Sequence, residues 1–158
     1  MLILAASLAT KIIFFYLFLI NNPCKLAFDS AHYNEIATNI VTKKSICSND
    51  GSAQFYRLPG YPAFLASCYK FFGININKTL LTQVAISALI PILIFILSIS
   101  LFPGNIAAAK LAAIISIFHI GFLIYSGLVL SDVLFLIMFL IFMILFLPSF
   151  SLFFTNKK

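Results

Sequence analysis

Residues 79–102 read TLLTQVAISALIPILIFILSISLF and contain no charged side chain. About 20 predominantly apolar residues in an α-helix cross the hydrocarbon core of a bilayer, so this segment is long enough to span one. Residues 133–154, VLFLIMFLIFMILFLPSFSLFF, repeat the pattern, again without a charge. A chain this short cannot hide two such helices in a soluble core, because a small domain exposes much of its surface to water. The two segments therefore predict a membrane protein.

The composition of the whole chain agrees with this prediction. The chain has 158 residues, of which 63% are hydrophobic and 9% charged, whereas soluble domains are about half apolar and about a quarter charged. The net charge is +6, but the basic residues stand at the ends of apolar segments and form no basic face with interleaved aromatic residues. We therefore expect a multi-pass protein of the cell membrane, in contact with membrane lipid and not with nucleic acid.

Five apolar segments are expected to be helical, at residues 2–20, 59–72, 79–102, 106–130 and 133–154. The predicted fold is all-α, a polytopic transmembrane helical bundle that forms a single domain over residues 1–158. The first segment exceeds the roughly 7–15 apolar residues of a signal peptide, so it is expected to stay in the protein. Lys11 within it either reaches the membrane surface or faces other helices. Pro91 is expected to bend the third segment.

A long polar loop, residues 21–57, separates the first two apolar segments. Residues 29–41 within it carry apolar side chains at helical spacing on one face, which predicts a juxtamembrane amphipathic helix that lies flat in the interface. Asp29 is a good candidate for its N-cap. Lys43 and Lys44 suit its last turn, where positive charge meets the negative end of the helix dipole.

The orientation of the chain is indicated by the short turn at residues 73–77. Lys70 and Lys78 flank it, and the positive-inside tendency places such a turn in the cytoplasm. If residues 59–72 cross the membrane, the polar loop 21–57 then faces outward.

The three cysteines do not have the spacing of a metal site, and no metal ligands are assigned from them. Cys24 and Cys47 both fall in the polar loop, and two interpretations stay open. They form a disulfide if the loop faces an oxidising compartment, or they remain two thiols. Cys68 lies in an apolar helix and is expected to serve packing.

Two acidic residues are candidates for chemistry. Asp29 is either a helix cap or a general base at the mouth of a cavity, with His32 and Tyr33 close enough along the helix to share the site. Asp132 stands between two apolar segments and is either the N-cap of the last helix or a functional group in a cavity. His119, inside an apolar segment, is more simply explained by a structural hydrogen bond.

The segment from Arg57 to Pro62 is the most informative polar motif. Pro59 and Pro62 enclose Gly60 and fix a rigid turn at a helix start. The helix N-terminus offers free N–H groups and a positive dipole end, and arginine binds phosphate with two parallel hydrogen bonds. This motif predicts either a phosphate site at the membrane surface or an interfacial arginine anchor.

The order of these motifs resembles the N-terminal part of the GT-C superfamily of membrane glycosyltransferases. The closest resemblance is to its dolichyl-phosphate-mannose protein mannosyltransferase-like and aminoarabinose-transferase-like branch. The motifs are Asp29-Ser30-x-x-Tyr33-x-x-x-Ala37, Arg57-x-Pro59-Gly60-Tyr61-Pro62-x-Phe64-Leu65, Phe72-Gly73, Gln83, Tyr125-Ser126 and Ser131-Asp132-x-Leu134-Phe135. They extend over most of the chain.

The resemblance implies transfer of a sugar from a polyprenyl-phosphate-linked donor to an extracytoplasmic acceptor. It implies Asp29 as catalytic base or as a carboxylate associated with a divalent metal, and Asp132 as the second catalytic acid. It implies that Arg57 binds the carrier phosphate. The remaining substrate-binding candidates are Tyr33, Tyr61 and His32.

The chain also departs from the family pattern. Ser30 follows Asp29 where relatives often carry a second acid, Leu58 replaces the first residue of a double proline, and His119 stands where relatives often have proline. Family members have more membrane spans. The chain is therefore expected to be truncated, completed by a second chain that supplies the missing helices, or an inactive remnant.

Two questions stay open from the sequence. A non-catalytic membrane subunit and a small transporter subunit are the alternatives to an enzyme. If every apolar segment crosses the membrane, Asp132 lies opposite Asp29. If residues 106–130 dip in and return near His119, both acids lie on one side, which the resemblance favours.

Overall fold

The computed structural model describes residues 1–21, 29–47, 52 and 57–155, with side chains up to Leu147. This part of the chain is helical and contains no strand. Its helices are α1 (Leu2–Phe14), η1 (Phe15–Leu19), α2 (Ser30–Lys43), α3 (Gly60–Phe72), α4 (Ile76–Ser87), α5 (Ile90–Leu101), α6 (Ile106–Phe118), α7 (Ile120–Ser126) and α8 (Asp132–Thr155). The all-α prediction is confirmed for these residues.

Two helical units are long and apolar enough to cross a membrane. They are Leu2–Leu19, formed by α1 and η1, and Ile76–Leu101, formed by α4 and α5. The pair α6 and α7 becomes a third if its members, bent by 51° at His119, form one broken span. α8 adds a helix of 24 residues, of which the part Asp132–Leu147 is an apolar helix shorter than a candidate span.

The helix formed by α4 and α5 is interrupted where Pro91 was expected to bend it. Ala88 and Leu89 form a turn between the two helices, and the Ala88 N–H donates to the Val84 and Ala85 carbonyls at 3.2 Å. Proline has no N–H, and its ring collides with the carbonyl four residues earlier, which here belongs to Ser87. The helix therefore restarts at Ile90 on a new turn.

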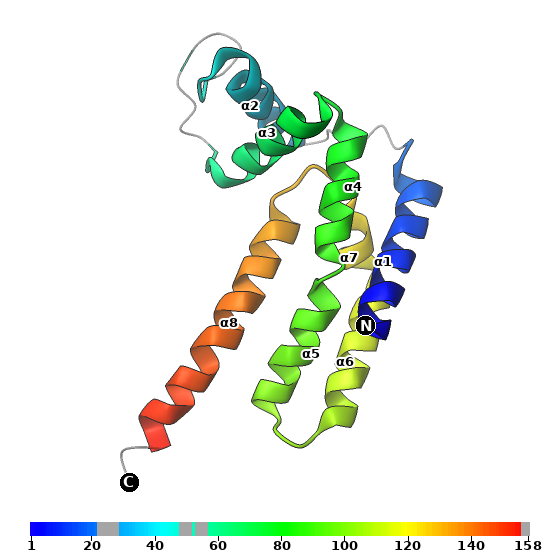
Figure 1. The fold of residues 1–158 in the computed structure, drawn as a ribbon, viewed down its shortest axis with the longest axis vertical. Helices are drawn as coiled ribbons and strands as arrows, with labels where there is room; N and C mark the ends of the chain where they lie inside the picture. The colour runs from blue at the N-terminus through cyan, green and yellow to red at the C-terminus, as the bar shows by residue number, and fades with distance from the viewer. Residues whose placement is uncertain (22–28, 48–51, 53–56, 156–158) are drawn as a thin grey trace.

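Helices α2 and α3 form a cap at one end of the bundle (Figure 1). They pack on each other through buried apolar side chains, including Ala37 of α2 and Leu65 of α3, and the Tyr69 hydroxyl donates to Asn34 Oδ1. α3 has 13 residues, fewer than a bilayer crossing needs. Both of its ends lie at the cap end of the molecule.

This position of α3 corrects the expectation that the polar loop and the turn at residues 73–77 lie at opposite ends. That prediction required residues 59–72 to cross, so that the turn at 73–77 and the polar loop would lie at opposite ends. The structure places the α3–α4 turn and the cap at the same end (Figure 1). The expectation of opposite ends was wrong because α3 is short and buries its apolar face against α2 and α4.

The position of α3 also explains why Asp29 and Asp132 lie at the same end of the molecule. The α6–α7 unit runs along the bundle toward the cap and does not turn back, and α8 begins at the cap end with Asp132 (Figure 1). Asp29 and Asp132 therefore lie at one end of the molecule. The expectation that this requires residues 106–130 to dip in and return was wrong: α3 is the segment that does not traverse the bundle.

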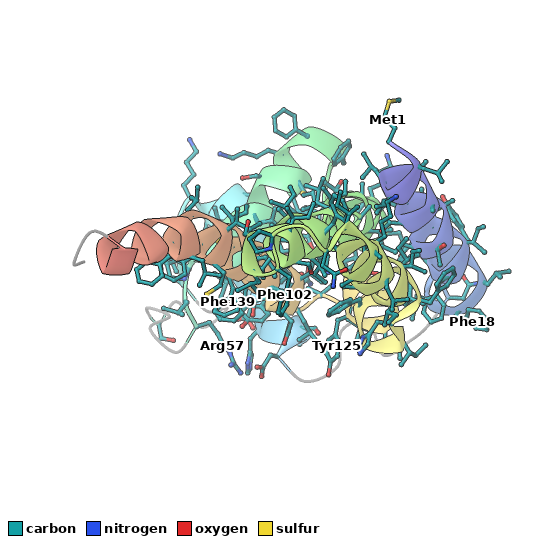
Figure 2. The ribbon with its side chains drawn as sticks, turned by 90° about the horizontal axis from the view of Figure 1, so that it is seen from below. Met1, Phe18, Arg57, Phe102, Tyr125 and Phe139 are labelled. Atoms are coloured by element: carbon teal, nitrogen blue, oxygen red, sulfur yellow. The ribbon has the colours of Figure 1, made fainter. Side chains whose placement is uncertain are left out.

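The core lies mostly where the cap meets the bundle. Phe15 and Leu19 of η1, Leu80 and Val84 of α4, and Val129 form one cluster with the buried face of the cap. A second cluster joins α5 to α8. Away from these contacts the helices expose large apolar side chains, such as Phe18 of η1, which points outward (Figure 2).

Lys11 is the charged exception inside the bundle. It is 1% exposed, and its Nζ donates to the Phe122 carbonyl of α7 at 3.5 Å. Of the two positions expected for this side chain, the structure shows the one that faces other helices.

Candidate functional site

A groove of about 500 Å³ opens at the junction of the cap with α8. Its polar side is formed by Tyr33, Arg57, Tyr61 and Ser131, and its apolar side by Leu58, Leu134, Phe135 and Met138. This volume lies within the range of about 300–1,000 Å³ typical of small-molecule sites. The segments that line it are far apart in the sequence and meet only because α3 stays at the cap end.

An ion pair between Arg57 and Asp29 stands at the rim of the groove. Asp29 precedes the first residue of α2, and Arg57 lies just before the proline turn that begins α3. Both side chains therefore sit at helix N-termini, whose positive dipole ends favour negative charge. The Arg57 side chain is 20% exposed and that of Asp29 is 45% exposed. A pair so accessible to water contributes about 0–1 kcal/mol to stability.

The sequence left open whether Asp29 caps α2 or acts as a general base, and the structure bears on the first of these roles. Asp29 occupies the N-cap position of α2, but its side chain makes no capping hydrogen bond with that helix. Its carboxylate instead contacts the Arg57 guanidinium. The backbone explains this, because Asp29 already has helical angles (φ −67°, ψ −19°), whereas a capping residue normally has extended ones.

Tyr33 connects the ion pair to the start of α8. The Arg57 guanidinium carbon lies 5.7 Å from the centroid of the Tyr33 ring, a cation–π geometry that contributes about 0.5–1 kcal/mol at an exposed site. The Tyr33 hydroxyl lies 3.5 Å from the hydroxyl of Ser131. The Tyr33 ring also meets the Tyr61 ring edge-on, with centroids 5.0 Å apart. Arg57 is thus held from two sides.

Tyr61 and Gln83 form a buried polar network below the groove. The Tyr61 hydroxyl donates to Gln83 Oε1 at 2.7 Å. Gln83 is fully buried, and its Nε2 donates to the Leu128, Ser126 and Tyr125 carbonyls at 2.7, 3.1 and 3.3 Å. Burial, followed by the charge interactions of nearby groups, raises the pKa of Tyr61. Tyr61 therefore stays a neutral donor, and the network ties α3 and α4 to the segment that leads into α8.

The predicted site residues are only partly brought together. Arg57, Asp29, Tyr33 and Tyr61 converge on the groove and its rim. Asp132 is exposed at the first turn of α8, beside the groove residue Ser131 but not lining the groove. His32 is exposed on α2 and does not line it either, because adjacent helical residues point in different directions.

The apolar wall of the groove was not anticipated as part of a site. Leu134, Phe135 and Met138 occupy one side of the first turns of α8. Their sequence shows only a uniformly apolar helix, in which no face stands out. The sequence signal that could have indicated this wall is Ser131, a polar residue that interrupts the apolar sequence just before Leu134.

A divalent metal was among the possible cofactors. In the part of the chain that the structure describes, no three His, Cys, Asp or Glu side chains come together as a ligand set. Cys24 lies outside the described residues, and so do the two alternatives predicted for Cys24 and Cys47.

Comparison of the chain with protein-family models, with curated proteins and with solved structures found no match.

Proposed function

We propose that this chain is a polytopic membrane protein whose groove binds a polyprenyl-phosphate-linked sugar, and that its chemistry is glycosyl transfer. The carrying observation is the groove itself, where an arginine–aspartate pair faces an apolar wall on α8. A lipid phosphate likewise combines a charged group with an apolar chain. Its phosphate suits the Arg57 guanidinium, and its first isoprene units suit Leu134, Phe135 and Met138.

The location of the groove supports a lipid ligand. It lies where the cap meets the end of α8, and the candidate spans Leu2–Leu19 and Ile76–Leu101 run away from that end. If these helices cross a bilayer, the groove lies at the level of the headgroups. A carrier then reaches it from the membrane with its chain still in lipid. Phe135 and Met138 are each 70% exposed, so this wall is open to such a chain.

The chemistry uses the two charged groups in sequence. Arg57 binds the phosphate of the donor and thereby exchanges the Asp29 carboxylate for a phosphate oxygen. Asp29, released from that pair, accepts the proton of an acceptor hydroxyl. The hydroxyl oxygen then bonds to the anomeric carbon, and the bond from that carbon to the phosphate oxygen breaks. The polyprenyl phosphate leaves with the electron pair, and Arg57 stabilises its charge.

The test is a binding measurement on the purified full chain in nanodiscs, with a short-chain polyprenyl phosphate as the probe. Arg57→Ala removes a charged hydrogen-bond donor, and such bonds contribute about 1.5–3 kcal/mol. We therefore expect about 10- to 100-fold weaker binding. Lys43→Ala is the matched control, since Lys43 is an exposed cation of the cap that does not line the groove, and it should bind like wild type. Equal binding of the polyprenyl phosphate by Arg57→Ala and wild type would contradict the proposal.

A transporter subunit is less well supported than an enzyme. Proton- or ion-coupled transport usually depends on acidic groups within the membrane interior. Among the described residues the buried polar side chains include Lys11 and Gln83 but no acid. The described acids Asp29, Glu35 and Asp132 lie in or beside α2 and at the start of α8.

A non-catalytic carrier-binding subunit remains the alternative that shares the groove. It predicts the same loss of binding in Arg57→Ala. Transfer of a labelled sugar from the carrier to an acceptor, dependent on Asp29, separates the enzyme from this alternative.

A further inference from the structure

A second hollow lies on the cap, apart from the groove. It has a volume of about 430 Å³ and an apolar floor formed by Ile40, Val41, Ile46 and Ala63. Lys44 and Lys70 stand at its edge, from α2 and α3 respectively. None of the residues that line it is acidic, and it shares no residue with the groove.

The side of the hollow that carries Lys44 is held in place by the backbone. Lys44 follows the last residue of α2 and has a left-handed conformation, with φ +54°. Residues other than glycine seldom adopt it, and the surroundings must fix it where it occurs. Here the buried Asn39 side chain donates to the Cys47 carbonyl at 2.8 Å. This bond closes the turn through Lys44, Ser45 and Ile46 against α2.

The position of Lys70, on the other side of the hollow, indicates at which level of the bundle the hollow lies. Lys70 belongs to the last turn of α3, and α4 begins shortly afterwards at Ile76, the first residue of the candidate span Ile76–Leu101. A lysine so close to the end of a membrane-length helix lies at the level of lipid headgroups. The hollow therefore combines two cations at headgroup level with an apolar floor.

We propose that this hollow is a binding site for an anionic phospholipid. Lys44 and Lys70 bind the phosphate, and Ile40, Val41 and Ile46 contact the glycerol backbone and the start of an acyl chain. Charge complementarity selects the ligand, because two lysines, with no acid among the described residues that line the hollow, attract an anionic headgroup and disfavour a cationic one. The lipid holds the cap down on the membrane. The proposal rests on the membrane location of the chain but not on glycosyl transfer.

The test is the apparent Kd of a short-chain phosphatidylglycerol for the purified full chain in neutral detergent. Each lysine near an anionic lipid contributes about 1 kcal/mol, so the double variant Lys44→Gln, Lys70→Gln should bind about 30-fold more weakly. The double variant Lys43→Gln, Lys78→Gln is the matched control. It removes the same charge from exposed positions at the same end of the molecule, and it should bind within a factor of about three of wild type. Helical circular dichroism checks that both variants fold.

Three results would overturn the proposal. Wild-type affinity in the Lys44, Lys70 variant excludes the site. An equal loss in both double variants shows diffuse attraction of lipid to a basic surface. Competition by inorganic phosphate as effective as that by phosphatidylglycerol shows that the hollow binds free phosphate and not a lipid. The test is independent of the groove, since Arg57→Ala should leave phosphatidylglycerol binding at Lys44 and Lys70 in place.

Discussion

Asp29 and Arg57 each have one interaction that changes if a phosphate enters the groove. In the structure the two side chains neutralise each other at the rim. A phosphate group competes with the Asp29 carboxylate for the same guanidinium, because the planar guanidinium binds either group through two parallel hydrogen bonds. In the proposed reaction, binding of the donor and release of the base are therefore coupled at a single residue, Arg57.

This coupling predicts opposite effects of Asp29→Asn on binding and on transfer. The variant removes the carboxylate that competes for Arg57, so binding of a polyprenyl phosphate should tighten by up to about fivefold, which corresponds to the 0–1 kcal/mol of an exposed ion pair. Transfer should fall by about 10²- to 10⁴-fold, because the general base is lost. Binding and single-turnover transfer of a labelled sugar measure the two effects. A variant that binds more weakly, or transfers as fast as wild type, contradicts the assigned role of Asp29.

Gln83 shows how a single buried residue determines the shape of the groove. Its side chain uses both the acceptor and the donor end, with the Tyr61 hydroxyl on one side and carbonyls of the α7–α8 connection on the other. In Gln83→Leu these buried groups keep their polar atoms but lose their hydrogen bonds. Each such loss costs about 1–3 kcal/mol.

We therefore expect Gln83→Leu to lower the free energy of unfolding by about 3 kcal/mol, measured in detergent. Tyr61→Phe leaves the bonds from Gln83 to the carbonyls intact and should cost about 1 kcal/mol. The double variant should cost less than the sum of the two single variants, because both remove the same Tyr61–Gln83 bond. Strictly additive losses would show that this bond does not couple α3 to α4.

At the scale of helices, η1 and Gly127 provide a close contact. The turn Phe15–Leu19 is wound as a π-helix, which widens the helix where it meets the connection between α7 and α8. A Cβ atom on Gly127 would lie 2.2 Å from Leu19 Cδ1 and 3.2 Å from Phe15 Cδ2. The end of the first helical unit and the start of the α8 segment therefore approach to a distance that only glycine allows.

Gly127→Ala should lower the thermal unfolding midpoint of the protein in detergent, with a loss of about 1–3 kcal/mol from overpacking. Leu19 can rotate away in part, so Gly127→Val should cost more than Gly127→Ala. Gly60→Ala is the matched control, because nothing lies within 4 Å of a Cβ atom at Gly60, and its effect should stay within about 0.5 kcal/mol. Equal midpoints for Gly127→Ala and Gly60→Ala would contradict the close contact.

The helices also show which features the sequence predicts. The expected helices at residues 29–41 and 59–72 appear as Ser30–Lys43 and Gly60–Phe72, because caps, proline turns and apolar spacing are local signals. The placement of α3 across the end of the bundle depends on contacts with α2 and α4 that are distant in sequence. The apolar segment alone does not reveal it.

In the candidate site, too, some features follow from the sequence and others only from contacts made in the fold. The resemblance implied separate roles for Asp29 and Arg57 in one site, and the structure shows that the two side chains form an ion pair. The partners of Gln83 are backbone carbonyls, which no residue type encodes. The exclusion of His32 from the groove follows from the rotation of α2 about its axis, which is set by its packing on α3.

At the scale of the whole molecule, the basic residues that the structure describes are unevenly distributed between the two ends. The cap and the α3–α4 turn carry Lys43, Lys44, Arg57, Lys70 and Lys78, whereas α6 carries Lys110 near the opposite end. The positive-inside tendency would place the cap in the cytoplasm. The resemblance to extracytoplasmic glycosyltransferases implies the other side, so orientation is the property on which these two arguments disagree.

Charge distribution acts directly on insertion, and a surface rich in anionic lipid is characteristic of the cytoplasmic leaflet. We therefore predict that the cap faces the cytoplasm. The measurement uses the variant Cys24→Ser, Cys47→Ser, Cys68→Ser, to which either Ser67→Cys or Phe102→Cys is added. Ser67 is exposed on α3, and Phe102 is exposed in the α5–α6 turn at the other end. In intact cells a membrane-impermeant maleimide should label the cysteine at 102 and reach the one at 67 only after permeabilisation. The reverse pattern would contradict the prediction, and it would place the groove on the side where the resemblance expects the acceptor.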